Sequence, residues 1–334
     1  MGIYQFPGGP ALDPDAAARL LSAVPGDRRA FFKRAAAMGL AAPMLGGLVS
    51  AARAQETPEA TPGHEMGRDG YVGSDPESPS TGDASPIPTE ANPFALYDPV
   101  LPRVEAGPKE ITVVAIDETL LIAKDVPYAA WTFDGTVPGR ALRVVEGDEI
   151  NFTLRIDPNA STAHSMDFHS AQTAPDVNYK TILPGEEFSW SFAPRHAGAY
   201  MYHCGTPPVL MHIGAGMYGA MIVDPAGGWP EAQELVLVQS DYYLAAGEGG
   251  VMVPDYAKML GNGGMDYVVF NGHATQYVEN PIAVRAGEPI RIFVVNAGPN
   301  AYSTFHVVGA IFDRVCVNAN PRNELFGLQS WTVG

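Results

Sequence analysis

The sequence predicts an all-β protein with two consecutive β-sandwiches, and three observations carry this prediction. From about residue 93, short apolar and β-branched runs alternate with turns rich in Gly, Pro and Asp, a pattern typical of a sandwich. The pattern pauses near Asp224-Pro225 and then restarts. The tetrapeptides at 145–148 (VEGD) and 285–288 (RAGE) each precede an apolar run, as equivalent turns in two copies of one fold would.

The expected strands fall into two groups on either side of this pause. The first group is Glu110–Ile116, Ala141–Val145, Glu149–Ile156, Glu187–Phe192, Gly198–Tyr202 and Tyr218–Val223. The second group is Glu234–Gln239, Tyr267–Asn271, Ile282–Arg285, Ile290–Asn296, Thr304–Val308 and Ile311–Val317. At 334 residues the chain is long enough for two domains of ordinary size. We therefore expect a first domain at 96–226 and a second at 227–334.

Residues 1–95 read as an export signal followed by a linker. The run at 28–33 (RRAFFK) resembles a twin-arginine motif, an apolar stretch follows at 35–52, and Ala52-Arg53-Ala54 fits a cleavage site. Residues 55–95 are rich in Pro, Glu, Ser and Thr and poor in large apolar side chains, so we expect a disordered linker. The sequence thus predicts a signal peptide at 1–54 and an exported, periplasmic protein.

The charge and the cysteine count limit the classes of function. The chain has 20 Lys and Arg against 37 Asp and Glu, a net charge of −17. This charge argues against a nucleic-acid partner, because such binding needs a basic face. An anionic substrate would need a local cation, such as a metal ion. Only two Cys are present, so a Cys that binds a metal leaves no disulfide framework.

The run at 202–217 (YHCGTPPVLMHIGAGM) carries the clearest functional signal. It places a thiolate, an imidazole and a thioether at Cys204, His212 and Met217, with a further His203 directly before the Cys. A Cys, two His and a weak axial Met form the ligand set of blue-copper electron-transfer sites. The second His of such a set must come from elsewhere in the chain.

The run at 164–169 (HSMDFH) supplies that ligand, and strand geometry sorts the side chains. Along an extended segment, successive side chains point to opposite faces, so His164 faces away from Asp167 and His169, and His203 faces away from Cys204. The first predicted set, a complete type 1 copper site, is His164, Cys204, His212 and Met217. The second predicted set, two imidazoles of another metal site with a carboxylate beside them, is His169, His203 and Asp167. Adjacent positions 203 and 204 would join the two sites by a short covalent path.

Residues from about 97 to 334 resemble copper-containing nitrite reductase, the enzyme of denitrification with two cupredoxin domains. The matching stretches are 130–139 (AWTFDGTVPG), 164–175 (HSMDFHSAQTAP), 201–219 (MYHCGTPPVLMHIGAGMYG) and 305–315 (FHVVGAIFDRV). The resemblance implies two cupredoxin-like Greek-key sandwiches, copper as the cofactor in type 1 and type 2 sites, and one-electron reduction of nitrite to nitric oxide.

The resemblance also implies a role for individual residues. His164, Cys204, His212 and Met217 match the type 1 ligands, and His169 and His203 match two of the three type 2 ligands. Asp167 matches the acid that hydrogen-bonds nitrite, His306 the second catalytic residue, and Val308 the apolar residue over the type 2 copper. The family pattern further implies a homotrimer with the type 2 site at the subunit interface. It implies a periplasmic cytochrome c or cupredoxin as electron donor.

The sequence departs from the family pattern at the third type 2 ligand. The family has a His near the end of the second domain, and no His follows His306 in this chain. We therefore expect a sequence truncated at its C-terminus, with the second sandwich incomplete.

Two other functions deserve comparison. A laccase-like multicopper oxidase needs His-x-His pairs and a His-Cys-His, but Gly205 follows Cys204 and the chain has no His-x-His. A non-enzymatic blue-copper electron carrier needs only the first ligand set. That alternative leaves His169, His203 and Asp167 without a role.

Overall fold

The structure is a computed structural model that describes residues 96–262 and 264–334. The export signal expected at 1–54 and the linker expected at 55–95 lie outside the described residues. Within the described part of the chain, no helix is both long and apolar enough to cross a membrane.

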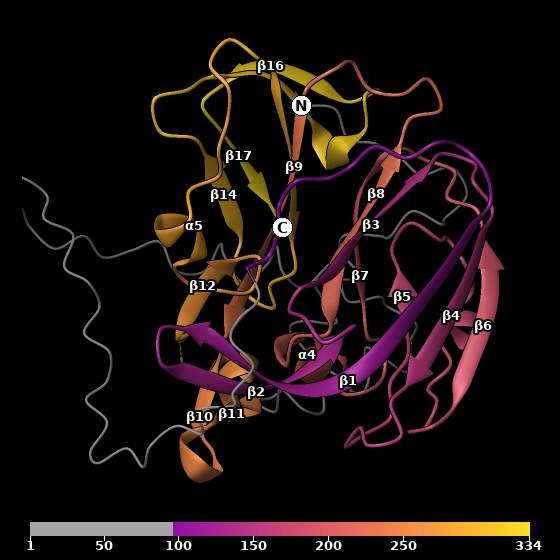
Figure 1. The fold of residues 1–334 in the computed structure, drawn as a ribbon, viewed down its shortest axis with the longest axis vertical. Helices are drawn as coiled ribbons and strands as arrows, with labels where there is room; N and C mark the ends of the chain where they lie inside the picture. The colour runs from indigo at the N-terminus through magenta and orange to yellow at the C-terminus, as the bar shows by residue number, and fades with distance from the viewer. Residues whose placement is uncertain (1–95, 263) are drawn as a thin grey trace, which may run out of the picture. The chain divides into compact units, whose positions relative to one another are not determined.

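The described residues form an all-β fold, as the sequence predicts. In the first half, two sheets enclose a core (Figure 1). One contains β1 (Lys109–Ala123), β2 (Val126–Phe133), β4 (Ile150–Ile156) and β6 (Glu187–Phe192). The other contains β3 (Gly139–Val145), β5 (Asp167–Phe168), β7 (Gly198–His203) and β8 (Tyr218–Asp224). Side chains along β4 alternate between buried and more exposed, the period of two expected for a strand with one face on a core.

The second half contains a three-stranded sheet and two strand pairs. The sheet has the order β12 (Tyr267–Phe270), β9 (Gln233–Tyr242), β13 (Ile290–Asn296). The pairs are β14 (Ser303–His306) with β17 (Ser330–Val333), and β15 (Phe312–Cys316) with β16 (Glu324–Leu328). Short helical segments lie between strands in both halves: α3 (Pro175–Asn178), α4 (Val209–Gly214), η3 (Glu248–Gly250), η4 (Lys258–Asn262), α5 (Gln276–Glu279) and η5 (Val317–Ala319).

The two halves repeat one strand arrangement. In the first half β4 pairs in parallel with β1, and in the second half β13 pairs in parallel with β9. The tetrapeptides at 145–148 and 285–288 form the turns just before β4 and β13, and both turns contain a glycine with positive φ, Gly147 and Gly287. Only glycine takes this conformation without steric cost, which explains the shared Gly. The equivalence of the two turns, predicted from sequence, is therefore confirmed.

Several local predictions need correction. The segment Ile282–Arg285, expected as a strand, has no regular structure: Val284 is half exposed, and the segment pairs with no described strand. The strand β2 was missed because its sequence, VPYAAWTF, contains Pro and Ala, which are depleted in strands. The segment α4, for which the sequence predicts no regular element, is a short helix.

The strands β10 (Leu244–Ala246) and β11 (Met252–Pro254) follow the expected domain boundary but belong to the first sheet. They extend it in the order β10-β11-β2-β1-β4-β6, with Met252 paired to Tyr128 (Figure 1). A second core, distinct from the one between the first two sheets, contains side chains from both halves, among them Tyr128, Tyr218 and Tyr242. The division at residue 226 stays a prediction, and the packing runs continuously across it.

A buried ionic cluster also joins the two halves. Glu234 on β9 is 4% exposed and pairs with Arg143 on β3 at 2.9 Å, with Arg103 at 3.3 Å, and with Arg291 on β13. Arg143 makes a two-pronged contact with Asp224 at the end of β8, at 2.8 and 3.0 Å. Removing one partner of such a cluster leaves an uncompensated buried charge, which costs about 3–5 kcal/mol. This cluster fixes β9 against the end of β8.

Candidate metal centres

The structure brings the predicted ligand residues together in two clusters, each with its donor atoms within 4.8 Å of one another. The first cluster is His164, Cys204 and His212, all buried. The second cluster is Asp167, His169 and His203, of which only His203 is buried. The partition predicted from strand alternation is the one observed.

The register of β5 against β7 explains this partition. Asp167 lies directly opposite His203, and Phe168 lies opposite Tyr202, so Asp167 and His203 share one face of the sheet. Phe168 and Tyr202 point the other way and are fully buried in the core. Cys204 is one residue beyond His203 and therefore faces the same side as Tyr202, toward the interior.

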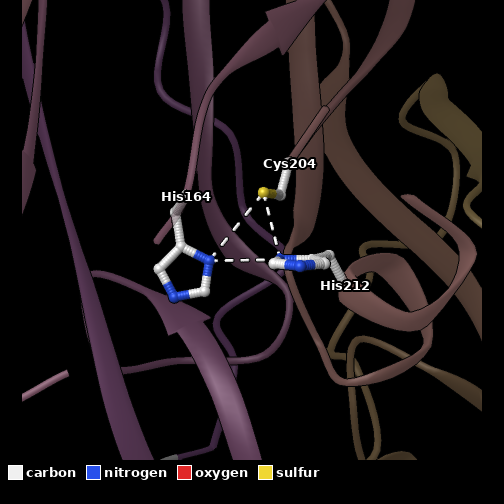
Figure 2. A group of neighbouring side chains, drawn as sticks. All are labelled: His164, Cys204 and His212. Atoms are coloured by element: carbon white, nitrogen blue, oxygen red, sulfur yellow. Dashed lines mark hydrogen bonds between the residues drawn. The ribbon is translucent and has the colours of Figure 1, made fainter. Parts of the chain in front are cut away.

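Figure 2 shows the three side chains of the first cluster converging on one point. The Nδ1 atoms of His164 and His212 are 3.2 Å apart, and the Cys204 sulfur lies 3.8 and 3.3 Å from them. Burial lowers the pKa of His164 to about 3 and that of His212 to about 4, so both rings are neutral at neutral pH. Neutral imidazoles present the lone pair that a metal needs.

The thiol of Cys204 lies in a polar surrounding within the core. Burial raises the pKa of this thiol, and hydrogen bonds from the backbone and side chains of Ser165 and Thr206 lower it. The Ser165 N–H donates to the sulfur at 3.4 Å. These donors favour the thiolate, the form in which a cysteine binds a metal.

The helix α4 and the turn after it place the remaining donors. His212 lies in the last turn of α4, and the N–H of Met217 donates to the His212 carbonyl at 3.1 Å. The N–H of Cys204 in turn donates to the Met217 carbonyl at 3.1 Å, which sets the fully buried Met217 next to the cysteine. Gly216, between His212 and Met217, has φ +123°, and a Cβ there would lie 2.9 Å from the Trp131 carbonyl oxygen. A glycine is therefore required for this turn.

The Trp131 ring borders the first cluster, a contact that sequence reasoning did not identify. Its ring centroid lies 4.7 Å from that of His212 and 5.7 Å from that of His164. Residue 131 belongs to one of the stretches that carry the family resemblance, but nothing in its local pattern indicates that β2 passes the cluster.

The second cluster is more open and its imidazoles face each other. The Nε2 atoms of His169 and His203 are 3.0 Å apart, and Asp167 Oδ2 lies 3.5 Å from His203 Nε2. Partial desolvation of its ring and the neighbouring His203 lower the pKa of His169, while Asp167 opposes this shift. The His203 Nδ1 lies 2.9 Å from the Cys204 carbonyl oxygen, so the neutral ring carries its proton there. That hydrogen bond leaves the Nε2 lone pair of His203 directed at His169 and Asp167.

The donor chemistry of both clusters fits copper. A thiolate and two imidazole nitrogens, with a thioether beside them, are the donors of a blue-copper site. In the second cluster, a ring nitrogen of His203 with a free lone pair faces a second imidazole and a carboxylate, and a cation between them would satisfy all three. The hydrogen bond from His203 Nδ1 to a carbonyl is the outer contact that commonly orients a ligating histidine.

The structure does not bring the other two predicted site residues to these clusters. His306 lies on β14, where it is exposed and its Nδ1 is 2.5 Å from the Gln329 carbonyl oxygen. Val308 follows in the turn after β14 and is 92% exposed. Neither belongs to the second cluster within the described chain.

Comparisons with known proteins find similarity to copper-containing enzymes. Residues 116–227 match the sequence model of a family described as multicopper oxidase. The chain is 38% identical over 224 residues to the copper-containing nitrite reductase of Neisseria meningitidis serogroup B, a match that covers 66% of this chain and 57% of that protein. The chain spans a little more than half the length of this relative and of two other Neisseria copper-containing nitrite reductases.

Two solved structures share the fold at substantial identity. The copper nitrite reductase of Nitrosomonas europaea is 38% identical with a TM-score of 0.61, and the match covers 68% of this chain and 80% of that one. The copper-containing nitrite reductase of Thermus scotoductus SA-01 is 30% identical with a TM-score of 0.60, and the match covers 69% of this chain and 53% of that one.

Proposed function

This chain belongs to the copper-containing nitrite reductase family, and we propose that it reduces nitrite to nitric oxide by one electron. The observation that carries the proposal is the link between the clusters: Cys204 belongs to one and its neighbour His203 to the other. The hydrogen bond from His203 Nδ1 to the Cys204 carbonyl adds a second connection beside the covalent one. Two metal-binding clusters joined in this way suit transfer of an electron from a buried site to an open one.

The difference in burial assigns the two roles. Copper at the first cluster would supply one-electron exchange as a type 1 site, and copper at the second would bind nitrite as a Lewis acid and reduce it as a type 2 site. His164, Cys204, His212 and Met217 would hold the first ion, and His169 and His203 would hold the second. Burial of the first cluster would hold its donors in place when the ion changes oxidation state.

The reaction consumes two protons, and acidic side chains must deliver them. Nitrite, one electron and two protons give nitric oxide and water, with one N–O bond broken. Asp167 is partly exposed at the edge of the second cluster, 3.5 Å from His203 Nε2, within reach of an anion bound there. We propose that Asp167 hydrogen-bonds nitrite and delivers one proton to the leaving oxygen.

The exposed positions of His306 and Val308 suit a site completed by a second copy of the chain. We propose a homotrimer in which β14 of one subunit brings His306, as the second proton donor, and Val308 to the second cluster of its neighbour. We further propose a periplasmic cytochrome c or cupredoxin as electron donor, and export by the twin-arginine route. With a net charge of −17, the chain would repel nitrite without the positive charge of the metal.

Replacing Asp167 tests the catalytic assignment. The variant Asp167→Asn keeps the size of the side chain but removes its acid, so we expect nitrite turnover to fall about 100-fold, the scale of a lost general acid. The visible band of the first copper should stay unchanged. The matched control is Asp125→Asn, at an exposed turn residue with φ 57° that Asn tolerates well. Near-normal turnover in Asp167→Asn would contradict the assignment.

The non-enzymatic electron carrier is the second candidate, because the first cluster has the full donor set of a blue-copper site among the described residues. Copper content separates the two functions. Nitrite reduction requires two copper ions per chain and a response to nitrite, whereas a carrier would bind one copper ion per chain and show no such response.

A further inference from the structure

The sulfur of Cys204 lies next to a polar group that none of the proposed ligands provides. Ser165, directly after His164, is fully buried, and its N–H donates to the Cys204 sulfur at 3.4 Å. Its hydroxyl oxygen accepts the Gly205 N–H at 3.1 Å. Ser165 therefore contacts both the sulfur and the chain that follows the cysteine.

Two more hydroxyl groups extend this contact toward the surface. The Thr206 hydroxyl, 7% exposed as a residue, donates to Ser165 Oγ at 3.0 Å. The Thr181 hydroxyl lies 3.0 Å from that of Thr206. Thr181 is exposed, and the next residue, Ile182, pairs its backbone with His164. The three side chains thus form a row from solvent to the copper ligand, which we call the hydroxyl chain (Thr181, Thr206 and Ser165).

The donor and acceptor roles of the three hydroxyl groups follow from the number of protons on each. A hydroxyl has one proton and two acceptor lone pairs. Ser165 Oγ uses both lone pairs for Gly205 and Thr206, so its own proton is left to donate, and its side chain hydrogen-bonds the Cys204 sulfur. Thr206 directs its one proton toward Ser165 Oγ and the Cys204 sulfur, so the Thr181 hydroxyl must donate to Thr206. Every hydroxyl therefore donates toward the sulfur, an arrangement in which successive bonds polarise one another.

We propose that the hydroxyl chain Thr181–Thr206–Ser165 is a positioning device that raises the reduction potential of the copper bound by Cys204. Hydrogen bonds to a ligating sulfur withdraw electron density from it, so they weaken its donation to the oxidised ion and favour the reduced one. The hydroxyl chain also ties the segment after Cys204 to Ser165, which holds the donors in place. The proposal rests on copper at the first cluster but not on nitrite as the substrate.

The local sequence suits this role. Pro207 and Pro208 have no N–H, so the two positions after Thr206 offer the sulfur no backbone donor. Thr206 is the last residue before them that can donate, and its side chain is turned inward to Ser165. The Thr206 hydroxyl is thus the connection between the buried serine and the exposed Thr181.

The test measures the reduction potential of the first copper in the copper-loaded, full-length chain, by redox titration of its visible band. The variant Thr206→Val removes the middle hydroxyl and should lower the reduction potential. We expect the equilibrium constant for electron exchange to change about tenfold, which corresponds to about 59 mV for a one-electron couple. Thr206→Ser, which keeps the hydroxyl, should restore the potential. The matched control is Thr153→Val, which removes a hydroxyl bonded to Ser189 at 2.8 Å on the more exposed face of β4 and β6; neither residue belongs to a cluster.

The end of the hydroxyl chain provides an independent variant. Thr181→Val changes an exposed residue, so it should fold and bind copper, and it should lower the potential in the same direction by less. If Thr206→Val fails to bind copper, Thr181→Val decides the question. The proposal would be overturned if Thr206→Val had the same reduction potential as the unmodified chain. If only Thr181→Val binds copper, an unchanged potential in that variant would overturn it. Because the titration needs no nitrite, a chain without nitrite turnover could still show the shift.

Discussion

The two clusters use similar side chains but differ in depth. The donors of the first are all buried, and Trp131 covers both of its imidazoles. In the second, His169 is exposed and Asp167 partly so, although His203 lies one residue from Cys204. A buried metal site can exchange electrons but excludes ligands, whereas an open one admits them. The alternation of a single strand is therefore enough to place one set of donors in the core and the other at an open face.

The largest effect that distinguishes the clusters should come from Cys204→Ser. A serine hydroxyl is a poor copper ligand compared with a cysteine thiolate. The first cluster should therefore lose its metal, and the visible band should disappear completely. The second cluster contains no atom of that side chain and should keep its copper. Metal analysis together with absorption spectroscopy checks both outcomes.

The loss of both copper ions in Cys204→Ser would mean that the clusters are not independent. Thr153→Val provides the control for general effects of a hydroxyl change, since it lies on β4 away from both clusters.

Acid should affect the buried cluster more than the open one. In protein freed of metal by chelation, the folded-state pKa values of His164 and His212, about 3 and about 4, lie below the unfolded value of about 6.5. The unfolded state therefore binds more protons below about pH 6.5, and the free energy of unfolding falls as the pH decreases toward these values. For His164 the loss is on the order of 3 kcal/mol at about pH 4.

Thermal unfolding of the metal-free chain between about pH 7 and pH 4 measures this loss. The variant His164→Gln, which cannot titrate, should lose less stability over the same range than the unmodified chain. An equal loss in both proteins would contradict the burial of a neutral imidazole at this position.

The sequence predicted the partition of the ligands because that prediction needs only local geometry. The side chains at 203 and 204 must face opposite ways if β7 is extended, and β7 runs through His203. The two equivalent turns with Gly147 and Gly287 were accessible for the same reason. Each prediction depends on a few consecutive residues.

Features that depend on contacts far apart in the sequence could not be predicted. Trp131 reaches His212 only because β2 crosses the end of α4, where the Trp131 N–H donates to the Ala215 carbonyl at 3.1 Å. The strands β10 and β11 join the first sheet through Met252, and no periodicity in either segment indicates that partner. The hydroxyl chain likewise combines three positions from separate segments, each unremarkable alone.

We propose that an electron passes from the buried cluster through Cys204 and His203 to nitrite at the open cluster. The most direct test of this path is to reduce the copper-loaded chain without oxygen until the visible band of the first copper is bleached, remove the reductant, and add nitrite. If the electron takes this path, the band returns and about one nitric oxide forms per electron delivered. A band that stays bleached in the presence of nitrite, in protein shown to hold copper at both clusters, would contradict it.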